Sequence, residues 1–188
     1  MLYTGKGDSG TTKVLDSKER FSKASIMAEA LGSLDELNSY LGVCKYKARE
    51  SEDDGVKVGK RVILTSELLR SIQESLFVVQ AQVAGAPKKI LKSKVTALEK
   101  ITNSIEAEIP PLKGFSIAGG TELSALFDVA RTIARRTERR VIAVHDGGER
   151  KLTPHTLAYL NRLSSVLFAL ARLSNHRSGI TEESPTYR

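Results

Sequence analysis

The chain has 188 residues, 40% of them hydrophobic and 27% charged, a composition typical of one globular domain and not of a disordered protein. Its net charge of +7 favours an anionic ligand, but the basic residues are dispersed and form no recognised nucleic-acid-binding motif. The single cysteine, Cys44, excludes an intrachain disulfide. Because the sequence has no apolar run of about 18 residues and no signal-peptide pattern, we expect a cytoplasmic protein without membrane or nucleic-acid partners.

A glycine-rich segment, Thr4-Gly5-Lys6-Gly7-Asp8-Ser9-Gly10-Thr11-Thr12, lies near the N-terminus. Glycines let backbone N–H groups approach a ligand closely, and the lysine and hydroxyls add donors, a combination suited to phosphate. The spacing Gly5-x-Gly7-x-x-Gly10 also matches the dinucleotide-binding fingerprint, but the sequence lacks the preceding strand and the βαβ unit which that motif requires. No Gly-Lys-Ser/Thr closes a Walker loop. These residues alone leave both a phosphate site and a flexible turn open.

Apolar residues at helical spacing predict five long amphipathic helices and no strands. The predicted helices cover residues 25–49, 60–84, 88–109, 121–145 and 154–174. In the first helix, the apolar stripe consists of Ala30, Leu34, Leu37, Leu41 and Cys44; in the third, it begins at Leu91. Such stripes must be buried against one another, so we predict an all-α fold, a five-helix antiparallel bundle.

The whole chain, residues 1–188, is predicted to form one domain. Residues 1–24 are assigned to the N-terminal loop, residues 25–174 to the helical bundle and residues 175–188 to a mobile tail. The polar stretch 50–59 is predicted to be a loop between the first two helices.

In the first predicted helix, Asp35 lies beside the apolar stripe, between Gly32 and Gly42. Each glycine costs a helix about 1 kcal/mol relative to alanine. This cost favours close approach of another helix or of a ligand. Tight packing with an exposed acid is the alternative.

The fourth predicted helix carries Arg131, Arg135 and Glu138, which are spaced by four and three residues and therefore share one face. Two guanidinium groups beside the buried stripe can bind a polyphosphate through several donors. A solvated face with ion pairs inside the helix is the alternative for the same pattern.

Two further features contain residues that a plain bundle would not need. The loop 113–120 carries Phe115, which is either an exposed aromatic contact or a core residue under the loop. On the fifth helix, Asn161, Phe168 and Arg172 share a face. Asn161 can contact an adenine edge or a ribose, or it can cap a neighbouring backbone group.

Taken in order, these motifs resemble those of the ATP:cob(I)alamin adenosyltransferases of the propanediol-utilisation type, the family that includes the human mitochondrial enzyme. The resemblance covers residues 2–174. It is carried by Thr-Gly-Lys-Gly-Asp-x-Gly, by Gly-x-x-Asp-Glu-Leu-Asn-Ser in the first helix, by the Phe-x-x-x-Gly-Gly loop, by Ala-Arg-x-x-Ala-Arg-Arg-x-Glu-Arg at 130–139, and by Asn-Arg-Leu-Ser at 161–164.

The resemblance implies transfer of the 5′-deoxyadenosyl group of ATP to the cobalt of cob(I)alamin, which gives adenosylcobalamin and triphosphate. It implies a homotrimer with ATP and corrinoid bound between subunits, Mg²⁺ accompanying ATP, and a reductase and an adenosylcobalamin-dependent mutase as partners. No protein-bound metal site is expected. A non-catalytic, nucleotide-responsive corrinoid chaperone or regulator is the alternative.

The resemblance also implies roles for individual residues. Asp35 would pair with Arg131 across the subunit interface, and Phe115 would occupy the lower face of the corrin and displace its axial ligand, so these three are the predicted catalytic residues. The predicted nucleotide-binding residues are Thr4, Gly5, Lys6, Gly7, Thr12, Lys23, Arg135, Glu138, Arg139 and Asn161.

Two positions depart from the family pattern. Ser165 stands where many members have an aspartate, so no charge pairing is assigned there. Ala118 stands where the loop usually has proline, which leaves the loop less rigid. Arg172 lies outside the motifs, and we expect Arg172→Ala to have little effect on ATP affinity or turnover.

Overall fold

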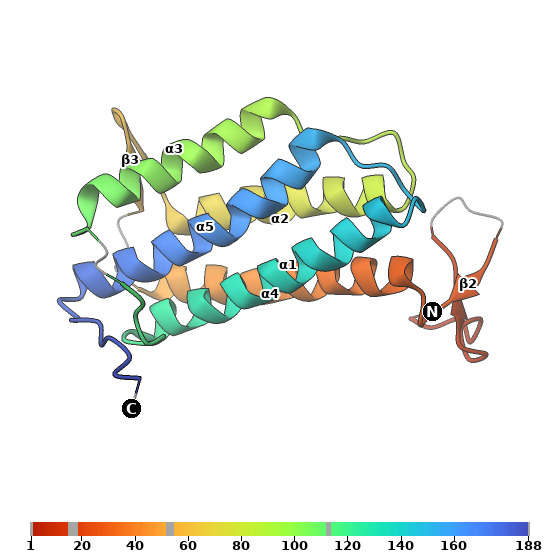
Figure 1. Ribbon diagram of the computed structural model, residues 1–188, viewed down its shortest axis with the longest axis horizontal. Coiled ribbons are helices and arrows are strands. Elements are labelled where there is room, and N and C mark those ends of the chain that lie inside the picture. The colour runs from red at the N-terminus through yellow and green to blue at the C-terminus, as the bar shows by residue number, and fades with distance from the viewer. Residues whose placement is uncertain (1, 15–18, 52–54, 112–113, 188) are drawn as a thin grey trace.

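The structure is a computed structural model, and it describes residues 2–14, 19–51, 55–111 and 114–187. Five helices form the molecule (Figure 1), and each overlaps one of the five predicted ranges. They are α1 (Ile26–Glu50), α2 (Thr65–Val83), α3 (Lys92–Glu108), α4 (Glu122–Asp146) and α5 (Pro154–Arg177). The predicted all-α bundle is confirmed.

Three of the helices begin at a hydroxyl residue that caps the first turn. Ser25 accepts a hydrogen bond from the backbone N–H of Ala28, and the threonines before α4 and α5 accept in the same way from the third residue of each helix. Such a cap satisfies one of the backbone donors that a helix leaves unpaired at its start. The sequence therefore fixes these three helix starts to within a residue.

Successive helices run in opposite directions (Figure 1), as the predicted antiparallel bundle requires. α1 packs between α2 and α4, and α5 packs between α4 and α3. The neighbours α3 and α5 run in the same direction. Two ion pairs show this: Glu99 of α3 pairs with Arg162 of α5, and further along both helices Glu108 pairs with Arg177. This parallel pair follows from the alternation of direction along the chain.

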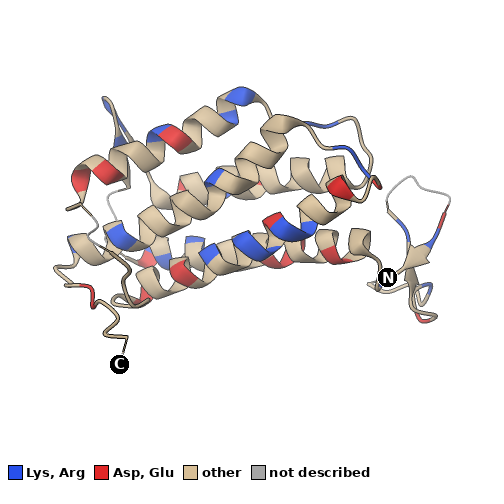
Figure 2. Ribbon diagram, in the orientation of Figure 1, with Lys and Arg blue, Asp and Glu red and all other residues tan. Residues whose placement is uncertain are grey.

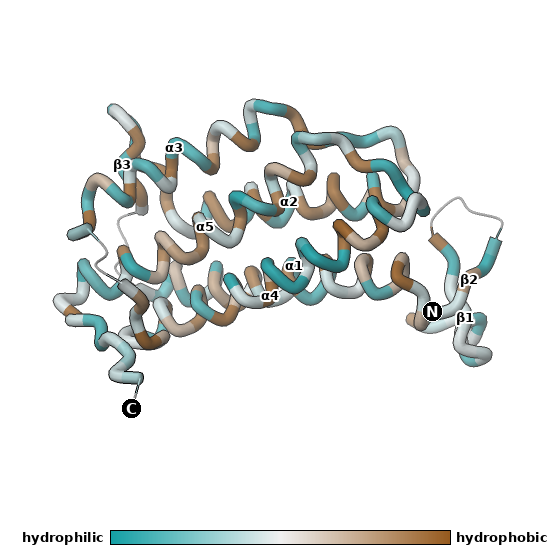
Figure 3. The backbone as a smooth tube through the Cα atoms, viewed as in Figure 1, coloured by the Kyte–Doolittle hydropathy of each residue, from teal (hydrophilic) through white to brown (hydrophobic). Residues whose placement is uncertain are grey.

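The core consists of the apolar stripes, and Figure 3 shows hydrophobic and hydrophilic residues alternating along the helices. In α1, the predicted stripe from Ala30 to Cys44 is fully buried. Leu91, which was predicted to begin the third stripe, is instead the N-cap of α3 and is 58% exposed. The prediction was wrong there because α3 begins four residues later than the periodicity indicated.

Two small hairpins contradict the prediction that the chain has no strands. β1 (Thr11–Thr12) pairs with β2 (Phe21–Ser22), and β3 (Val56–Val58) pairs with β4 (Arg61–Ile63), both antiparallel. β4 occupies residues that were assigned to the second helix, so α2 begins only at Thr65. Strands of two or three residues are too short for an alternating pattern to identify them.

The chain ends lie at opposite ends of the bundle (Figure 1). α5 continues three residues beyond the predicted boundary at 174, and Asn175 is buried within its last turn. Residues 175–183 hydrogen-bond to the loop that precedes α4: Asn175 Nδ2 donates to the carbonyl of Gly119 at 2.8 Å, and the N–H of Ile117 donates to the carbonyl of Glu183 at 2.8 Å. Mobility of the tail stays a prediction.

Candidate functional site

The glycine-rich N-terminal segment forms two tight turns. The N–H of Asp8 donates to the carbonyl of Gly5 at 3.2 Å, and the N–H of Gly10 donates to the carbonyl of Gly7 at 3.1 Å. Gly5 and Gly10 have φ of 67° and 75°, in the left-handed region that other residues rarely adopt. Glycine is therefore required by the backbone path of this loop.

Arg20, which directly precedes β2, holds the loop by three hydrogen bonds. Its Nη2 donates to the carbonyls of Lys6 at 2.5 Å and Thr11 at 2.8 Å, and its Nε donates to Thr11 Oγ1 at 2.9 Å. No local sequence pattern indicates this role of Arg20, because only the pairing of β1 with β2 brings it across the loop. Through these three hydrogen bonds, Arg20 stabilises the backbone path of the loop.

Lys23 covers the same loop from its other side. Its backbone N–H donates to the carbonyl of Gly10 at 2.9 Å, and a Cβ added to Gly7 would lie 2.9 Å from its Nζ. The ammonium group thus lies directly against Gly7. A cavity of about 540 Å³ adjoins this region, and Thr12, Lys13 and Lys23 line it together with α1 and α2.

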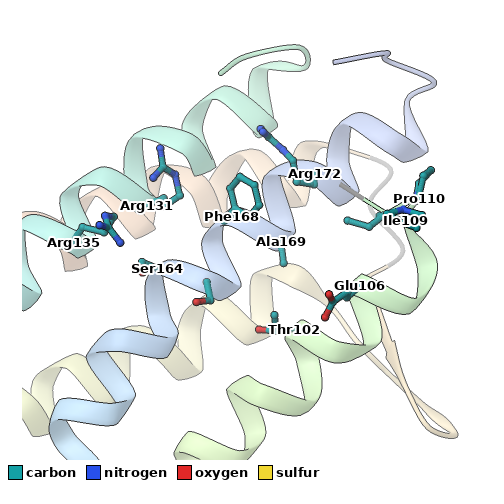
Figure 4. Close-up of a pocket in the computed structure, with 12 residues that line it drawn as sticks. Thr102, Glu106, Ile109, Pro110, Arg131, Arg135, Ser164, Phe168, Ala169 and Arg172 are labelled. Carbon is teal, nitrogen blue, oxygen red and sulfur yellow. The ribbon is translucent and has the colours of Figure 1, made fainter. Parts of the chain in front are cut away.

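The cationic face of α4 borders a second cavity, of about 530 Å³, between α3, α4 and α5 (Figure 4). Arg131 and Arg135 contribute two guanidinium groups to its lining, and Ser164, Ser165 and Phe168 line it from α5. Figure 2 shows several basic residues along α4. The cavity therefore combines cations, hydroxyls and an aromatic ring, which suits an anionic ligand with an apolar part.

Glu138 and Asn161 meet across the α4–α5 contact. Asn161 Nδ2 donates to Glu138 Oε1 at 2.9 Å, and Asn161 Oδ1 accepts from Arg162 Nη1 at 2.7 Å. Arg139, next to Glu138, donates from Nη1 to the carbonyl of Arg135, one turn earlier on α4, at 3.1 Å. The structure thus brings the predicted pair from two helices together, while their role in nucleotide binding stays a prediction.

Asp128 joins two arginines at the end of the second cavity. Its Oδ2 accepts from Arg172 Nη2 at 2.7 Å, and its Oδ1 lies 3.7 Å from Arg131 Nε. Arg172 is only 3% exposed. No sequence pattern indicates this buried pair, because no local spacing relates Arg172 to Asp128, 44 residues earlier. The small effect expected of Arg172→Ala on ATP affinity and turnover stays a prediction.

Asp35 lies exposed on the outer side of α1. Its neighbour Glu36 accepts a hydrogen bond from Arg136 of α4 at 2.5 Å. A Cβ added to Gly32 would meet nothing within 4 Å, so close approach of another helix of the same chain does not explain this glycine. The predicted pairing of Asp35 with Arg131 is between subunits, and it stays a prediction.

Phe115 is 79% exposed, which excludes the alternative that it is a core residue under its loop. It lines a third cavity, of about 600 Å³, with the end of α3 and the C-terminal segment. Pro110, Pro111 and Arg172 line both this cavity and the one beside Arg131, so the two adjoin. Lys113, which began the predicted loop, lies outside the described residues.

The N-terminal loop and the α4 arginines line different cavities. The N-terminal cavity is otherwise bounded by α1 and α2, the second by α3 and α5, and no residue lines both. Within residues 2–14, 19–51, 55–111 and 114–187, no group of three or more His, Cys, Asp or Glu is placed to hold a metal ion. Every helix in these same ranges is too short or too polar to cross a membrane.

Comparison with known proteins decides the family. The model of the family described as cobalamin adenosyltransferase matches residues 2–174, the same range that carries the resemblance found in the sequence. The chain belongs to the cobalamin adenosyltransferase family. It is 40% identical over 183 residues to the corrinoid adenosyltransferase of Bacillus subtilis, an alignment that covers 95% of this chain and 89% of the relative.

Other adenosyltransferases extend this comparison. The corrinoid adenosyltransferase of Mycobacterium tuberculosis is 33% identical, with 93% of this chain and 88% of the relative covered. The corrinoid adenosyltransferase PduO of Citrobacter freundii is 35% identical over 93% of this chain, which spans only 50% of that longer relative.

Solved structures of the PduO-type ATP:corrinoid adenosyltransferase of Lactobacillus reuteri have the same fold. A Phe-to-Ala variant complexed with cobalamin and ATP superposes with a TM-score of 0.84 at 27% identity, covering 99% of both chains. An Arg-to-Lys variant complexed with ATP gives 0.82 at 27% identity, covering 98% of this chain and 99% of that one. The predicted bundle of an adenosyltransferase is therefore confirmed.

Proposed function

We propose that this chain transfers the 5′-deoxyadenosyl group of ATP to the cobalt of cob(I)alamin. The observation that carries the proposal is family membership over residues 2–174, together with a cationic cavity on α4 of the size that a nucleotide requires. Cob(I)alamin supplies the electron pair that attacks C5′. The cobalt–carbon bond forms, the C5′–oxygen bond of ATP breaks, and inorganic triphosphate leaves with that oxygen.

The residues around the cavity act by positioning and by charge, because the corrinoid itself is the nucleophile. Arg135 and Arg139 bind the triphosphate, whose negative charge increases as it departs, and guanidinium donors stabilise that charge. Glu138 and Asn161, already hydrogen-bonded to each other, hold the nucleoside. The N-terminal loop, with Thr4 to Gly7, Thr12 and Lys23, encloses the phosphates.

Phe115 acts on the corrinoid. Its exposed ring lines a cavity next to the arginine cavity, a place from which it can cover the lower face of the corrin. An apolar ring there excludes the lower axial ligand and water. Removal of that ligand makes cob(II)alamin easier to reduce to the nucleophilic cob(I) state, while the protein provides geometry and electrostatics.

The complete site forms between subunits of a homotrimer. Two separate cavities in one chain support this, because the N-terminal loop lines one and the α4 arginines line the other, and a neighbouring chain can bring the two sets together. The outer side of α1 supports this, because Val43 is 50% and Tyr46 65% exposed on the same helix as Asp35. Asp35 then pairs with Arg131 of the next subunit.

Light scattering tests the oligomer. The wild type is expected to have the mass of three chains, and Tyr46→Glu is expected to shift the mass towards one chain because it places a charge in the interface. Tyr187→Glu changes an exposed tyrosine in the C-terminal tail and serves as the control. A monomeric wild type that binds ATP would contradict the intersubunit site.

Mg²⁺ accompanies ATP and is held mainly by phosphate oxygens. The reaction takes place in the cytoplasm. A reductase supplies the electron that gives cob(I)alamin, and an adenosylcobalamin-dependent mutase receives the product.

An anaerobic assay tests the proposed function. The protein is incubated with ATP, Mg²⁺ and chemically reduced cobalamin, and both the adenosylcobalamin spectrum and released triphosphate are measured. Equal amounts of the two products are expected. Binding of ATP and corrinoid without turnover would instead identify a chaperone or regulator.

A further inference from the structure

Arg172 contacts α4, the loop that carries Phe115, the Phe168 ring of its own helix and the C-terminal segment. Its Nη2 donates to Asp128 of α4 at 2.7 Å, and its Nη1 donates to Ser116 Oγ at 2.6 Å. Its guanidinium carbon lies 5.0 Å from the centre of the Phe168 ring. A buried arginine with these partners is fixed in position, since Nη1 and Nη2 are directed at separate acceptors.

The C-terminal segment supplies the fourth contact. Glu182 Oε1 lies 2.7 Å from Arg172 Nε and accepts from Asn175 Nδ2 at 2.7 Å. One residue further, the carbonyl of Glu183 accepts from the N–H of Ile117 at 2.8 Å. The segment after α5 is therefore attached both to Arg172 and to the backbone of the loop that carries Phe115.

That loop also packs directly on α5. The amide of Asn175 bonds the loop backbone on both sides of Gly120: Nδ2 donates to the carbonyl of Gly119, and Oδ1 accepts from the N–H of Thr121. Gly120 has φ of 110°, and a Cβ there would lie 2.3 Å from Asn175 Oδ1. Residues 114–121 are thus held at one end by Asn175 and in the middle by Ser116 and Ile117.

We propose that Arg172 and Glu182 are positioning residues that hold Phe115 at the mouth of its cavity. The Phe115 side chain is exposed, so its place depends on its loop, and Arg172 and the C-terminal segment fix that loop at the two residues following Phe115. This inference rests on the proposed function for its consequence, the handling of the corrinoid. It assigns the C-terminal segment to the corrinoid side of the site and not to ATP.

Glu182 is the better residue for a test of this positioning role, because its removal leaves no buried charge without a partner. Arg131 and Arg172 are matched by Asp128 and Glu182, and Arg172 and Asp128 are both buried. Removing Arg172 would leave Asp128 buried without its partner, with a loss of folding that obscures any local effect. Removing Glu182 leaves the Arg172–Asp128 pair intact, so Glu182→Ala detaches the segment while the bundle stays folded.

Hydrogen–deuterium exchange tests the attachment without any substrate. Glu182→Ala is expected to speed exchange of amides in residues 114–121, including Ile117, about tenfold, because opening of this loop then breaks fewer contacts. Glu183→Ala is the matched control: it removes an adjacent, exposed carboxylate but keeps the backbone carbonyl that Ile117 uses. Equal exchange rates in the two variants would overturn the attachment.

Ligand measurements test the consequence. With Glu182→Ala, turnover of cob(I)alamin should fall at least fivefold, and bound cob(II)alamin should retain its lower axial ligand in visible and paramagnetic resonance spectra. The Kd for ATP should stay within twofold of that of the wild type. Loss of ATP affinity in step with turnover, or an unchanged corrinoid spectrum, would refute a positioning role.

The two tests fail separately. If the wild type makes no adenosylcobalamin, the proposed function is wrong, yet exchange at Ile117 still decides whether Glu182 holds the loop. If the wild type is active and Glu182→Ala behaves like Glu183→Ala in exchange, spectrum and turnover, only the positioning inference is wrong.

Discussion

The N-terminal loop and the Phe115 loop, at opposite ends of the bundle, are held in place by different kinds of interaction. The N-terminal loop is exposed, and backbone turns and the surface guanidinium of Arg20 hold its shape. The loop with Phe115 is tied at the opposite end to a buried arginine and to the C-terminal segment. Exposed interactions are weak and screened, whereas buried charged hydrogen bonds are costly to break.

The two loops therefore differ in which contacts fix their conformation. The N-terminal loop has its backbone path set by its own turns and by Arg20, and the loop is exposed, which leaves it accessible to a ligand or a neighbouring chain. The Phe115 loop is tied to the rest of the chain by hydrogen bonds, and the aromatic ring is exposed at its surface. This difference agrees with the proposed roles: the N-terminal loop encloses the triphosphate of ATP, and the Phe115 loop presents a fixed surface to the corrin ring.

The largest effect should come from the buried end. Arg172→Met is expected to lower the free energy of unfolding by about 3 to 5 kcal/mol, because Asp128 would remain buried without its main partner. Urea denaturation measures this. Arg140→Met removes an arginine that pairs with Glu29 on the surface, and it should cost less than about 1 kcal/mol. Equal losses of unfolding free energy in the two variants would contradict the difference between buried and exposed ion pairs.

Arg135→Ala tests the open end through its ligand. Loss of a charged donor to triphosphate should weaken ATP binding about tenfold or more, measured by titration calorimetry. Arg140→Ala, on the same helix but facing α1, should leave ATP affinity within about twofold. Equal, small effects from both would make the basic face of α4 an ordinary solvated surface.

Cys44 is buried in the core of the bundle, so its ionisation reports on the stability of the whole fold and not on either loop. Burial raises the pKa of its thiol from 9.0 to about 12. The thiol therefore adds stability that is complete below pH 9 and is lost as pH rises towards 12, since the unfolded chain ionises first. At pH 10 the loss should be about 1.4 kcal/mol. Unfolding curves of the wild type and Cys44→Ala should diverge in slope above pH 9, and parallel curves would contradict this.

The smallest effect concerns the backbone of the N-terminal loop. Gly10→Ala has room for its methyl group but places alanine at φ of 75°, a strain of about 1 kcal/mol that should weaken ATP binding about fivefold. Gly59→Ala, at φ of 62° in the β3–β4 turn and with equally open space, carries the same strain far from the proposed site. If both variants bind ATP like the wild type, the loop is not a phosphate site.

Local patterns predicted the helices well because burial of a stripe depends on spacing within one segment. Ala30 to Cys44 needed no tertiary information, and the predicted start of this helix at residue 25 lies one residue before the observed start at Ile26. The hairpins were missed because β4 competes with a helical pattern that includes its residues, and pairing with β3 decides the outcome. The exposure of Phe115 was equally undecided in the sequence.

By itself the sequence determined the five helices, their order and the family, since each rests on residues close together in the chain or on motifs in a fixed succession. Only the tertiary structure decided the hydrogen-bond partners of Arg172 and Arg20, because these bonds join residues 9 to 56 positions apart. It also decided that the N-terminal loop and the α4 arginines line separate cavities. Helical spacing specifies which face of a helix is buried, whereas packing alone specifies what that face meets.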